Sequence, residues 1–253
     1  MKKYYPLLFS LFIAAVAGSC SLFSSAEKTP PPATKPMSFD YSPPAEGITK
    51  SNKIKFALIN PRYVATFKDA NTDPYKTFVK NMGSDFVEML TARGYPYMGP
   101  YTTTDEMVYS DKKGTDLLLE TEVDIQFTGT PLKYSTYTDY STKQTVYQYF
   151  YDGDVNMSGK VNLIFSEPFT KTKVWVKSVP IDPVTFYIKS FYKYKDKNIP
   201  DTDPMVWNTL VDNLEASYQK VLQTSWNHLQ PEELEVKKKE ATEIKQNSGF
   251  IKN

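Results

Sequence analysis

Few side chains in this sequence can support acid–base, nucleophilic or metal chemistry. The chain has 253 residues, with a single His, His228, and a single Cys, Cys20. A disulfide within the chain is therefore excluded, and a zinc site with the usual His and Cys ligands is nearly excluded. The sequence contains no glycine-rich phosphate loop, no Gly-x-Ser-x-Gly elbow and no His-Glu-x-x-His motif. We predict that the protein is not an enzyme and has no metal or cofactor.

Two remaining candidates for acid–base chemistry have simpler explanations. Glu120, Glu122 and Asp124 alternate with apolar residues, so they share one face of a predicted strand. They could act as paired carboxylates, but we expect a solvated face of a sheet. His228 lies near the end of a predicted helix, where a positive charge is favourable, and we expect it to pack or cap there.

The most distinctive chemistry lies in residues 134–151. This segment holds Tyr134, Tyr137, Tyr140, Tyr147, Tyr149 and Tyr151. Because Ser and Thr separate these residues, we expect a hairpin with a polar, tyrosine-rich tip. Tyr offers a flat apolar face and a hydroxyl at little entropic cost, which suits sugars and protein surfaces. The candidate binding surface consists of Tyr134, Tyr137, Tyr140, Lys143 and Tyr147. The alternative is that the strand tyrosines simply pack on the sheet.

The single Cys lies in a sequence typical of a bacterial lipoprotein signal. Lys2 and Lys3 precede an apolar run, residues 7–17, that is too short to span a bilayer. Small residues then lead directly to Cys20. We predict that residues 1–19 are removed and that lipidated Cys20 anchors the protein in the membrane. An ordinary secretory signal with an incidental Cys is the alternative. Since Ser21 rather than Asp follows Cys20, resemblance to sorted lipoproteins favours the outer membrane.

Three further segments follow the predicted signal. Residues 20–51 are rich in Pro, and we expect a lipid-anchored, semi-rigid tether that first contacts the folded domain at residues 38–41. Residues 52–230 form the predicted domain. Residues 231–253 are dense in Glu and Lys and predict a charged C-terminal helix and tail.

Apolar periodicity predicts an α+β domain. Runs with strand periodicity fall at residues 53–60, 95–101, 117–127, 155–165, 172–179 and 184–191. Two runs with helical periodicity, residues 73–93 and 203–229, each begin with Asp-Pro, in which we expect Asp to be the N-cap and Pro to lie in the first turn. We expect a mainly antiparallel sheet over residues 117–191, packed against these two long amphipathic helices, with the charged helix at residues 232–245 exposed.

The charge balance argues against a nucleic-acid partner. The 30 Lys and Arg residues nearly balance the 29 Asp and Glu residues, so the chain has no large net positive charge to attract the phosphates of a nucleic acid. The tyrosine-rich segment also contains no Arg. We therefore expect no nucleic-acid binding. The sequence does not decide whether the protein forms a homodimer.

Several short motifs follow one another along residues 39–246. They are Asp40-Tyr41-Ser42-Pro43-Pro44-Ala45, Gly94-Tyr95, Lys112-Lys113-Gly114, Gly159-x-Val161 and Glu167-Pro168. Their order and spacing resemble the neuraminyllactose-binding haemagglutinin family, surface adhesin lipoproteins of Gram-negative bacteria. The resemblance implies an adhesin-like function. The family member that gave the name has a short basic segment proposed to bind sialic acid, where this chain has Pro131-Leu132-Lys133-Tyr134-Ser135-Thr136.

These observations leave two functions from different classes. In the first, the protein is an outer-membrane lipoprotein, exposed at the cell surface, that binds a host glycan or protein. In the second, it is a structural or assembly lipoprotein that faces the periplasm and binds another bacterial component.

Overall fold

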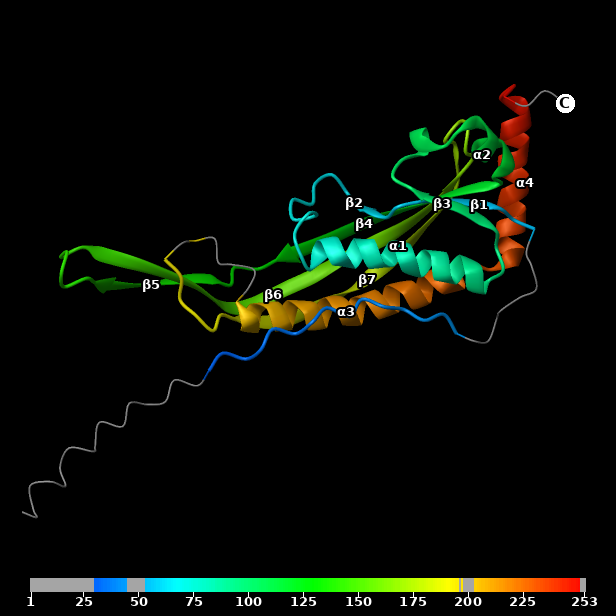
Figure 1. Cartoon of the computed structure of the whole chain (residues 1–253). Coiled ribbons are helices and arrows are strands. Elements are labelled where there is room, and N and C mark those ends of the chain that lie inside the picture. Colours follow the sequence, from blue (N-terminus) through cyan, green and yellow to red (C-terminus); the bar gives the residue numbers. More distant parts are fainter. Residues whose placement is uncertain (1–29, 45–52, 196, 198–202, 251–253) are drawn as a thin grey trace, which may run out of the picture. The chain divides into compact units, whose positions relative to one another are not determined.

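A mixed sheet of seven strands and four α-helices make up the part of the chain that the structure describes (Figure 1). The structure is a computed structural model, and it describes residues 30–44, 53–195, 197 and 203–250. The chain divides into two compact units, Met1–Pro32 and Ala33–Asn253, and the elements below belong to the second. The predicted α+β class is confirmed.

The elements follow in a simple order. The strands are β1 (Phe56–Ile59), β2 (Arg62–Tyr63), β3 (Tyr97–Tyr101), β4 (Leu117–Thr128), β5 (Leu132–Thr138), β6 (Thr145–Ser166) and β7 (Lys173–Lys189). The helices are α1 (Tyr75–Ala92), α2 (Tyr109–Gly114), α3 (Pro204–Asn227) and α4 (Pro231–Asn247), with a short 3₁₀ turn η1 (Thr104–Glu106).

The long ladders of the sheet are antiparallel and the short ones are parallel. Strand β6 pairs with β4, β5 and β7 in antiparallel fashion, whereas β1 pairs with β3 and β4, and β2 with β4, in parallel. The two strands expected at residues 172–179 and 184–191 are a single strand, β7. Pro180 and Pro183 lie within it, and Pro is tolerated there because β7 pairs only with β6 along this sheet.

Helices α1 and α3 bury their apolar faces, as their periodicity predicted. The buried side chains of α3 include Val211, Leu214 and Tyr218. Asp203 is the N-cap of α3, and its carboxylate accepts two backbone N–H groups of the first turn. At α1 the N-cap is Pro74 rather than the expected Asp73.

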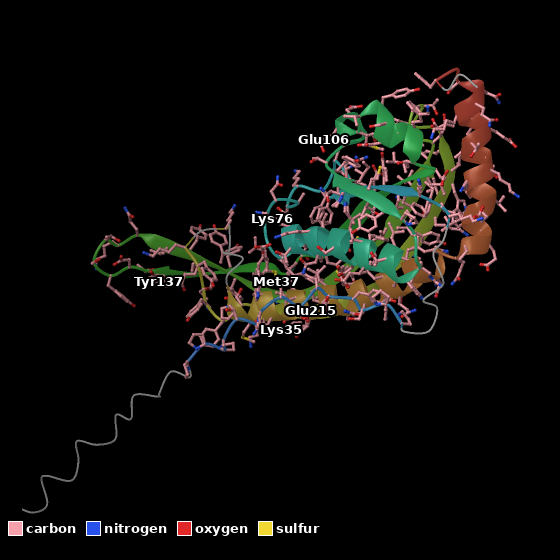
Figure 2. The ribbon with its side chains drawn as sticks, turned by 45° about the vertical axis from the view of Figure 1, so that its right-hand side comes forward. Lys35, Met37, Lys76, Glu106, Tyr137 and Glu215 are labelled. Atoms are coloured by element: carbon pink, nitrogen blue, oxygen red, sulfur yellow. The ribbon has the colours of Figure 1, made fainter. Side chains whose placement is uncertain are left out.

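Residues 33–44, which we call the N-terminal strap, lie along α3 (Figure 1). The side chain of Lys35 pairs with Asp212 and Glu215 at 2.6 and 2.5 Å, and Figure 2 shows Lys35 beside Glu215. Phe39 and Tyr41 are 1% and 4% exposed, in agreement with the contact expected at residues 38–41. Part of the proline-rich segment thus belongs to the folded unit and covers its core.

The charged helix α4 packs against the domain along one side. Leu234, Ala241 and Lys245 are buried. The Lys245 ammonium donates to the carbonyl groups of Lys112, Lys113 and Thr115 at 2.8–3.0 Å, so it caps the end of α2. The expectation of an exposed helix was therefore wrong for this side. Within the described residues, no helix is both long enough and apolar enough to cross a membrane.

Candidate functional site

The predicted tyrosine hairpin is present, formed by β5 and the first part of β6. Its ladder runs from Leu132 opposite Tyr151 to Thr138 opposite Thr145. At the tip, the Asp139 carboxylate accepts from the backbone N–H and hydroxyl of Ser141 at 2.9 and 2.6 Å. These hydrogen bonds lower the pKa of Asp139 below its usual value, because they favour the charged form. The carboxylate therefore orders the tip as a fixed turn.

All four candidate tyrosines of the hairpin expose much of their surface. The exposed fractions are 65% for Tyr134, 44% for Tyr137, 86% for Tyr140 and 50% for Tyr147. Lys143, also exposed, lies in the tip with a φ of 58°, in the left-handed region. The structure thus gathers all five predicted site residues on one hairpin (Figure 2 labels Tyr137).

The hairpin has two different faces. The register places Tyr134, Tyr147, Tyr149 and Tyr151 on one face, which we call the tyrosine face. The ring of Tyr134 lies 5.9 Å from that of Tyr147 and 6.4 Å from that of Tyr149. Tyr137 lies opposite Val146 on the other face. The predicted surface is therefore divided between a ring-bearing face, a second face and the tip.

The base of the hairpin is tied to the start of α3. Tyr149 and Tyr194 exchange two backbone hydrogen bonds of 2.7 and 2.8 Å. The Tyr194 hydroxyl donates to the buried carboxylate of Asp203 at 2.8 Å, and burial raises the Tyr194 pKa. Asp203 also accepts the backbone N–H of Phe191 and of Tyr192. Since Asp203 caps α3, the hairpin base and the helix start form one hydrogen-bonded unit.

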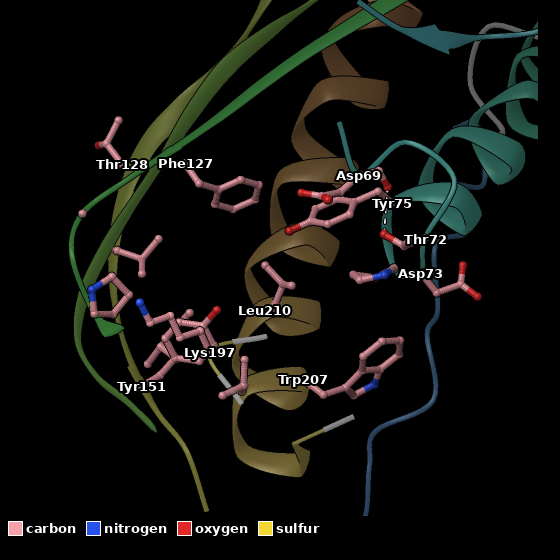
Figure 3. A pocket seen from close by; sticks show the side chains of 16 residues that line it. Asp69, Thr72, Asp73, Tyr75, Phe127, Thr128, Tyr151, Lys197, Trp207 and Leu210 are labelled. Carbon is pink, nitrogen blue, oxygen red and sulfur yellow. Dashed lines mark hydrogen bonds between the residues drawn. The ribbon is translucent and has the colours of Figure 1, made fainter. Parts of the chain in front are cut away.

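A cleft of about 520 Å³ opens beside this base (Figure 3). Four aromatic side chains from four separate elements line it, and we call it the aromatic cleft. These are Tyr75 of α1, Phe127 of β4, Tyr151 of β6 and Trp207 of α3. Thr72, Asp73 and Lys197 add polar groups. Its volume and its mixture of rings with a few polar groups are typical of small-molecule sites.

The aromatic cleft continues the tyrosine face. Tyr151 lies on that face and also lines the cleft. Lys197, another lining residue, lies 5.9 Å from the ring of Tyr149. Within the cleft, the rings of Tyr75 and Phe127 meet at 5.8 Å, as Figure 3 shows. A run of rings thus leads from the exposed hairpin into the cleft.

Comparison with solved structures identifies the fold. It is similar to that of a Helicobacter pylori protein described as a homolog of the neuraminyllactose-binding haemagglutinin, with 16% sequence identity and a TM-score of 0.55. The match covers 80% of this chain and 99% of the other. The two proteins share a fold. The resemblance inferred from the ordered motifs is thereby confirmed at the level of the fold.

Two further solved structures match more weakly. A lipoprotein from Neisseria meningitidis matches with 11% identity and a TM-score of 0.29, covering 52% of this chain and 83% of its own. A Xanthomonas campestris protein matches with 9% identity and a TM-score of 0.29, over 84% and 96%. The sequence matches no model of a known protein family and no curated protein.

The aromatic cleft was missed by sequence reasoning. Tyr75 and Trp207 follow the two Asp-Pro helix starts, and helical periodicity places each on the apolar face of its helix. The one signal in the sequence is that an aromatic residue follows each Asp-Pro pair within three positions. Their convergence on Phe127 depends on how both helices lie on the sheet, which no local pattern encodes.

The other candidate residues take structural roles. The Arg62 guanidinium lies 2.9 Å from the Glu122 carboxylate and 3.5 Å from that of Glu120, on a partly exposed sheet face. His228 is the C-cap of α3, where burial lowers its pKa and so favours the neutral form. No group of acidic, His or Cys side chains that could hold a metal occurs among the described residues. Cys20 lies outside the described residues.

Proposed function

We propose that the protein is a lipid-anchored, non-catalytic binding protein of the outer membrane, and that its aromatic cleft and tyrosine face bind a glycan. Three observations support the proposal. The sequence before Cys20 has the pattern of a lipoprotein signal. The fold is similar to that of a protein described as a haemagglutinin homolog. The observation that carries it is the convergence of four aromatic side chains on one cleft with a polar rim.

This mixture of side chains suits a sugar better than a purely apolar ligand. A sugar ring presents C–H groups that stack on aromatic faces and hydroxyls that need hydrogen-bond partners. Tyr75, Phe127 and Trp207 supply faces, while Asp69 and Lys197 supply an acceptor and a donor. A single sugar unit would meet most of these groups at once.

The tyrosine face favours a ligand longer than one sugar unit. Tyr134 and Tyr147 expose 65% and 50% of their surface, and Tyr134 lies 6.4 Å from the next ring, Tyr149. Tyr151 links that face to the cleft. Rings spaced in this way can stack successive units of an oligosaccharide. Tyr134 and Tyr147, two of the candidates from the sequence, are thus assigned to ligand contact.

Filling the cleft tests the proposal without removing any ring. Leu210 lines the cleft from α3 and is half-buried (Figure 3). Leu210→Trp should occlude the ligand and weaken binding to oligosaccharides by at least about tenfold, measured on a glycan array and by titration calorimetry. The matched control is Val236→Trp at an exposed position of α4, which should bind like the wild type.

Two results would contradict the glycan proposal. The first is undiminished binding by Leu210→Trp with an unchanged melting temperature. The second is a wild-type protein that binds no glycan on the array. That second result would favour the envelope assembly role, with another bacterial component as the partner.

The lipid anchor has its own test. Cys20→Ser should abolish acyl labelling and replace stable anchoring with at most a reversible surface contact, because acyl chains on Cys20 supply the hydrophobic anchoring. Membrane fractionation combined with acyl-chain labelling measures this directly. A variant that still takes up label and still partitions with membranes would rule out Cys20 as the anchor.

A further inference from the structure

The N-terminal strap fixes where the chain enters the folded unit. The carbonyl group of Ala33 accepts from the Asn208 side chain at 3.0 Å, and the Trp207 indole N–H donates to the carbonyl of Lys35 at 2.8 Å. Both partners lie in the first turns of α3. The strap then runs along α3 until Tyr41, whose hydroxyl donates to Gln223. Ala33 is therefore at the start of α3 and not at its end.

The first turn of α3 lies at the same end of the folded unit as the hairpin. Asp203, the N-cap of α3, accepts from the Tyr194 hydroxyl, and Tyr194 pairs with Tyr149 in the hairpin. The aromatic cleft lies at the same place, since Trp207 lines it. The chain thus enters the folded unit beside the base of the tyrosine hairpin.

The remaining chain to the anchor is short. Ala33 follows Cys20 by thirteen residues, which span at most about 45 Å when fully extended. The seven residues of β5 make the hairpin about 23 Å long. This step rests on the proposed lipidation of Cys20. It keeps the start of α3 within about 45 Å of the lipid surface, close enough for the hairpin tip to reach it.

The chemistry of the tip suits a lipid headgroup region. Tyr140 is 86% exposed and Tyr137 is 44% exposed, and Lys143 lies in the same turn. Tyr is enriched at membrane interfaces because its ring is apolar and its hydroxyl is polar. Lys residues near a surface attract anionic phospholipids.

Charges of both signs lie near the tip. The Asp139 carboxylate, held by Ser141 within the turn, is negative and offsets the charge of Lys143, so the two tyrosine rings supply the main contact. Asp152 lies 3.5 Å from the Lys133 ammonium and also accepts from the Tyr187 hydroxyl. On the face that holds Tyr137, the Lys193 ammonium adds a further positive charge, bonded to the Ser135 hydroxyl at 3.1 Å.

We infer that the hairpin tip, through Tyr137, Tyr140 and Lys143, docks on the phospholipid surface to which the chain is anchored. The tip then acts as a second, reversible contact beside the lipid anchor. The aromatic cleft lies at the base of the hairpin, about one hairpin length from the lipid. The domain is thereby held in one orientation instead of rotating freely on its tether.

Vesicle binding by a chain without the lipid tests the docking alone. The mature chain from residue 20 carrying Cys20→Ser should sediment with vesicles of equal parts phosphatidylethanolamine and phosphatidylglycerol. Tyr137→Ser combined with Tyr140→Ser should reduce the bound fraction at least about tenfold. Lys143→Gln should reduce it about fivefold on these vesicles, but not on phosphatidylcholine vesicles. The control is Tyr109→Ser, an exposed tyrosine of α2 outside the hairpin.

A fluorescence measurement reports on the contact itself. A Trp introduced as Tyr140→Trp should shift its emission to the blue on vesicles and be quenched by brominated lipid, whereas Tyr109→Trp should do neither. Equal vesicle binding by the wild type and the double tyrosine variant overturns the inference. So does an unlipidated chain that does not sediment with vesicles. Neither result bears on glycan binding at the cleft or on acyl labelling of Cys20, which have the separate tests above.

Discussion

Aromatic side chains serve opposite purposes in two regions of the unit. Between α1, α3 and the N-terminal strap, the rings of Phe39, Phe78 and Tyr218 lie 5.0–5.4 Å apart, and none is more than 1% exposed. In the hairpin, Tyr134 and Tyr140 are 65% and 86% exposed. The same residue types therefore build the core in one region and remain available for contact in the other.

The hydroxyl partners sharpen this difference. In the core, the Tyr218 hydroxyl donates to Asp85 at 2.5 Å, and burial followed by this hydrogen bond raises the Tyr218 pKa. Asp85 also accepts the backbone N–H of Tyr41 in the strap. Burial raises the pKa of Asp85 to about 6, although both hydrogen bonds act in the other direction. A buried Tyr thus needs a protein partner, whereas an exposed Tyr keeps its hydroxyl for water or a ligand.

The largest expected effect is in the core of α3. Leu214 is fully buried, so Leu214→Ala should lower the free energy of unfolding by about 2–5 kcal/mol. Leu132 of β5 is 42% exposed, and Leu132→Ala should change it by less than about 0.5 kcal/mol. Urea unfolding of both variants measures the contrast. Equal losses at the two positions would remove the distinction between core and hairpin.

The next effect depends on pH. Because the folded-state pKa of Asp85 is about 6 and the ordinary value is 3.8, the folded protein binds this proton more tightly than the unfolded chain. The contribution of Asp85 therefore stabilises the fold as pH falls through 6, by about 2 kcal/mol between pH 7.5 and 4.5. Asp85→Asn should remove this part of the pH dependence in urea unfolding. A wild-type and a variant curve of the same shape would contradict the buried-carboxyl account.

A smaller effect is expected at the base of the hairpin. Tyr149 is half-buried, lies across from Tyr134 and pairs with Tyr194. Tyr149→Ala should cost about 1 kcal/mol, because cross-strand ring contacts are lost while the backbone pairing remains. Thermal melting of the mature chain measures it. No change in melting temperature would mean that Tyr149 packs no more tightly than the tip residues.

The smallest effect is expected at the tip. Tyr137→Ala combined with Tyr140→Ala should change the free energy of unfolding by less than about 0.5 kcal/mol, since exposed rings bury little surface. The same melting experiment serves for comparison with Tyr149→Ala. A loss of stability as large as that of Tyr149→Ala would show that these rings pack on the sheet, which is the alternative expected from the strand propensity of Tyr.

The sequence predicts what local periodicity can encode. The helical runs after each Asp-Pro became α1 and α3, and the tyrosine-rich segment became the hairpin. The N-terminal strap is an element that local periodicity does not predict. Its prolines predict an extended chain, but not the pairing of Lys35 with Asp212 and Glu215, which lie far along the chain. Nor does any local pattern show that rings from α1, β4 and α3 meet in one cleft.

The most direct test of the cleft as a ligand site is the fluorescence of Trp207. Titration of the mature chain with sialyllactose, and with neutral oligosaccharides that bind on the array, should give a saturable change in tryptophan emission, because a sugar in the cleft contacts this ring. Trp207→Phe should abolish the change, whereas Trp175→Phe, at a position on β7 outside the cleft residues, should retain it. Glycan binding that leaves the emission of Trp207 unaltered, or a change that persists in Trp207→Phe, would contradict the account.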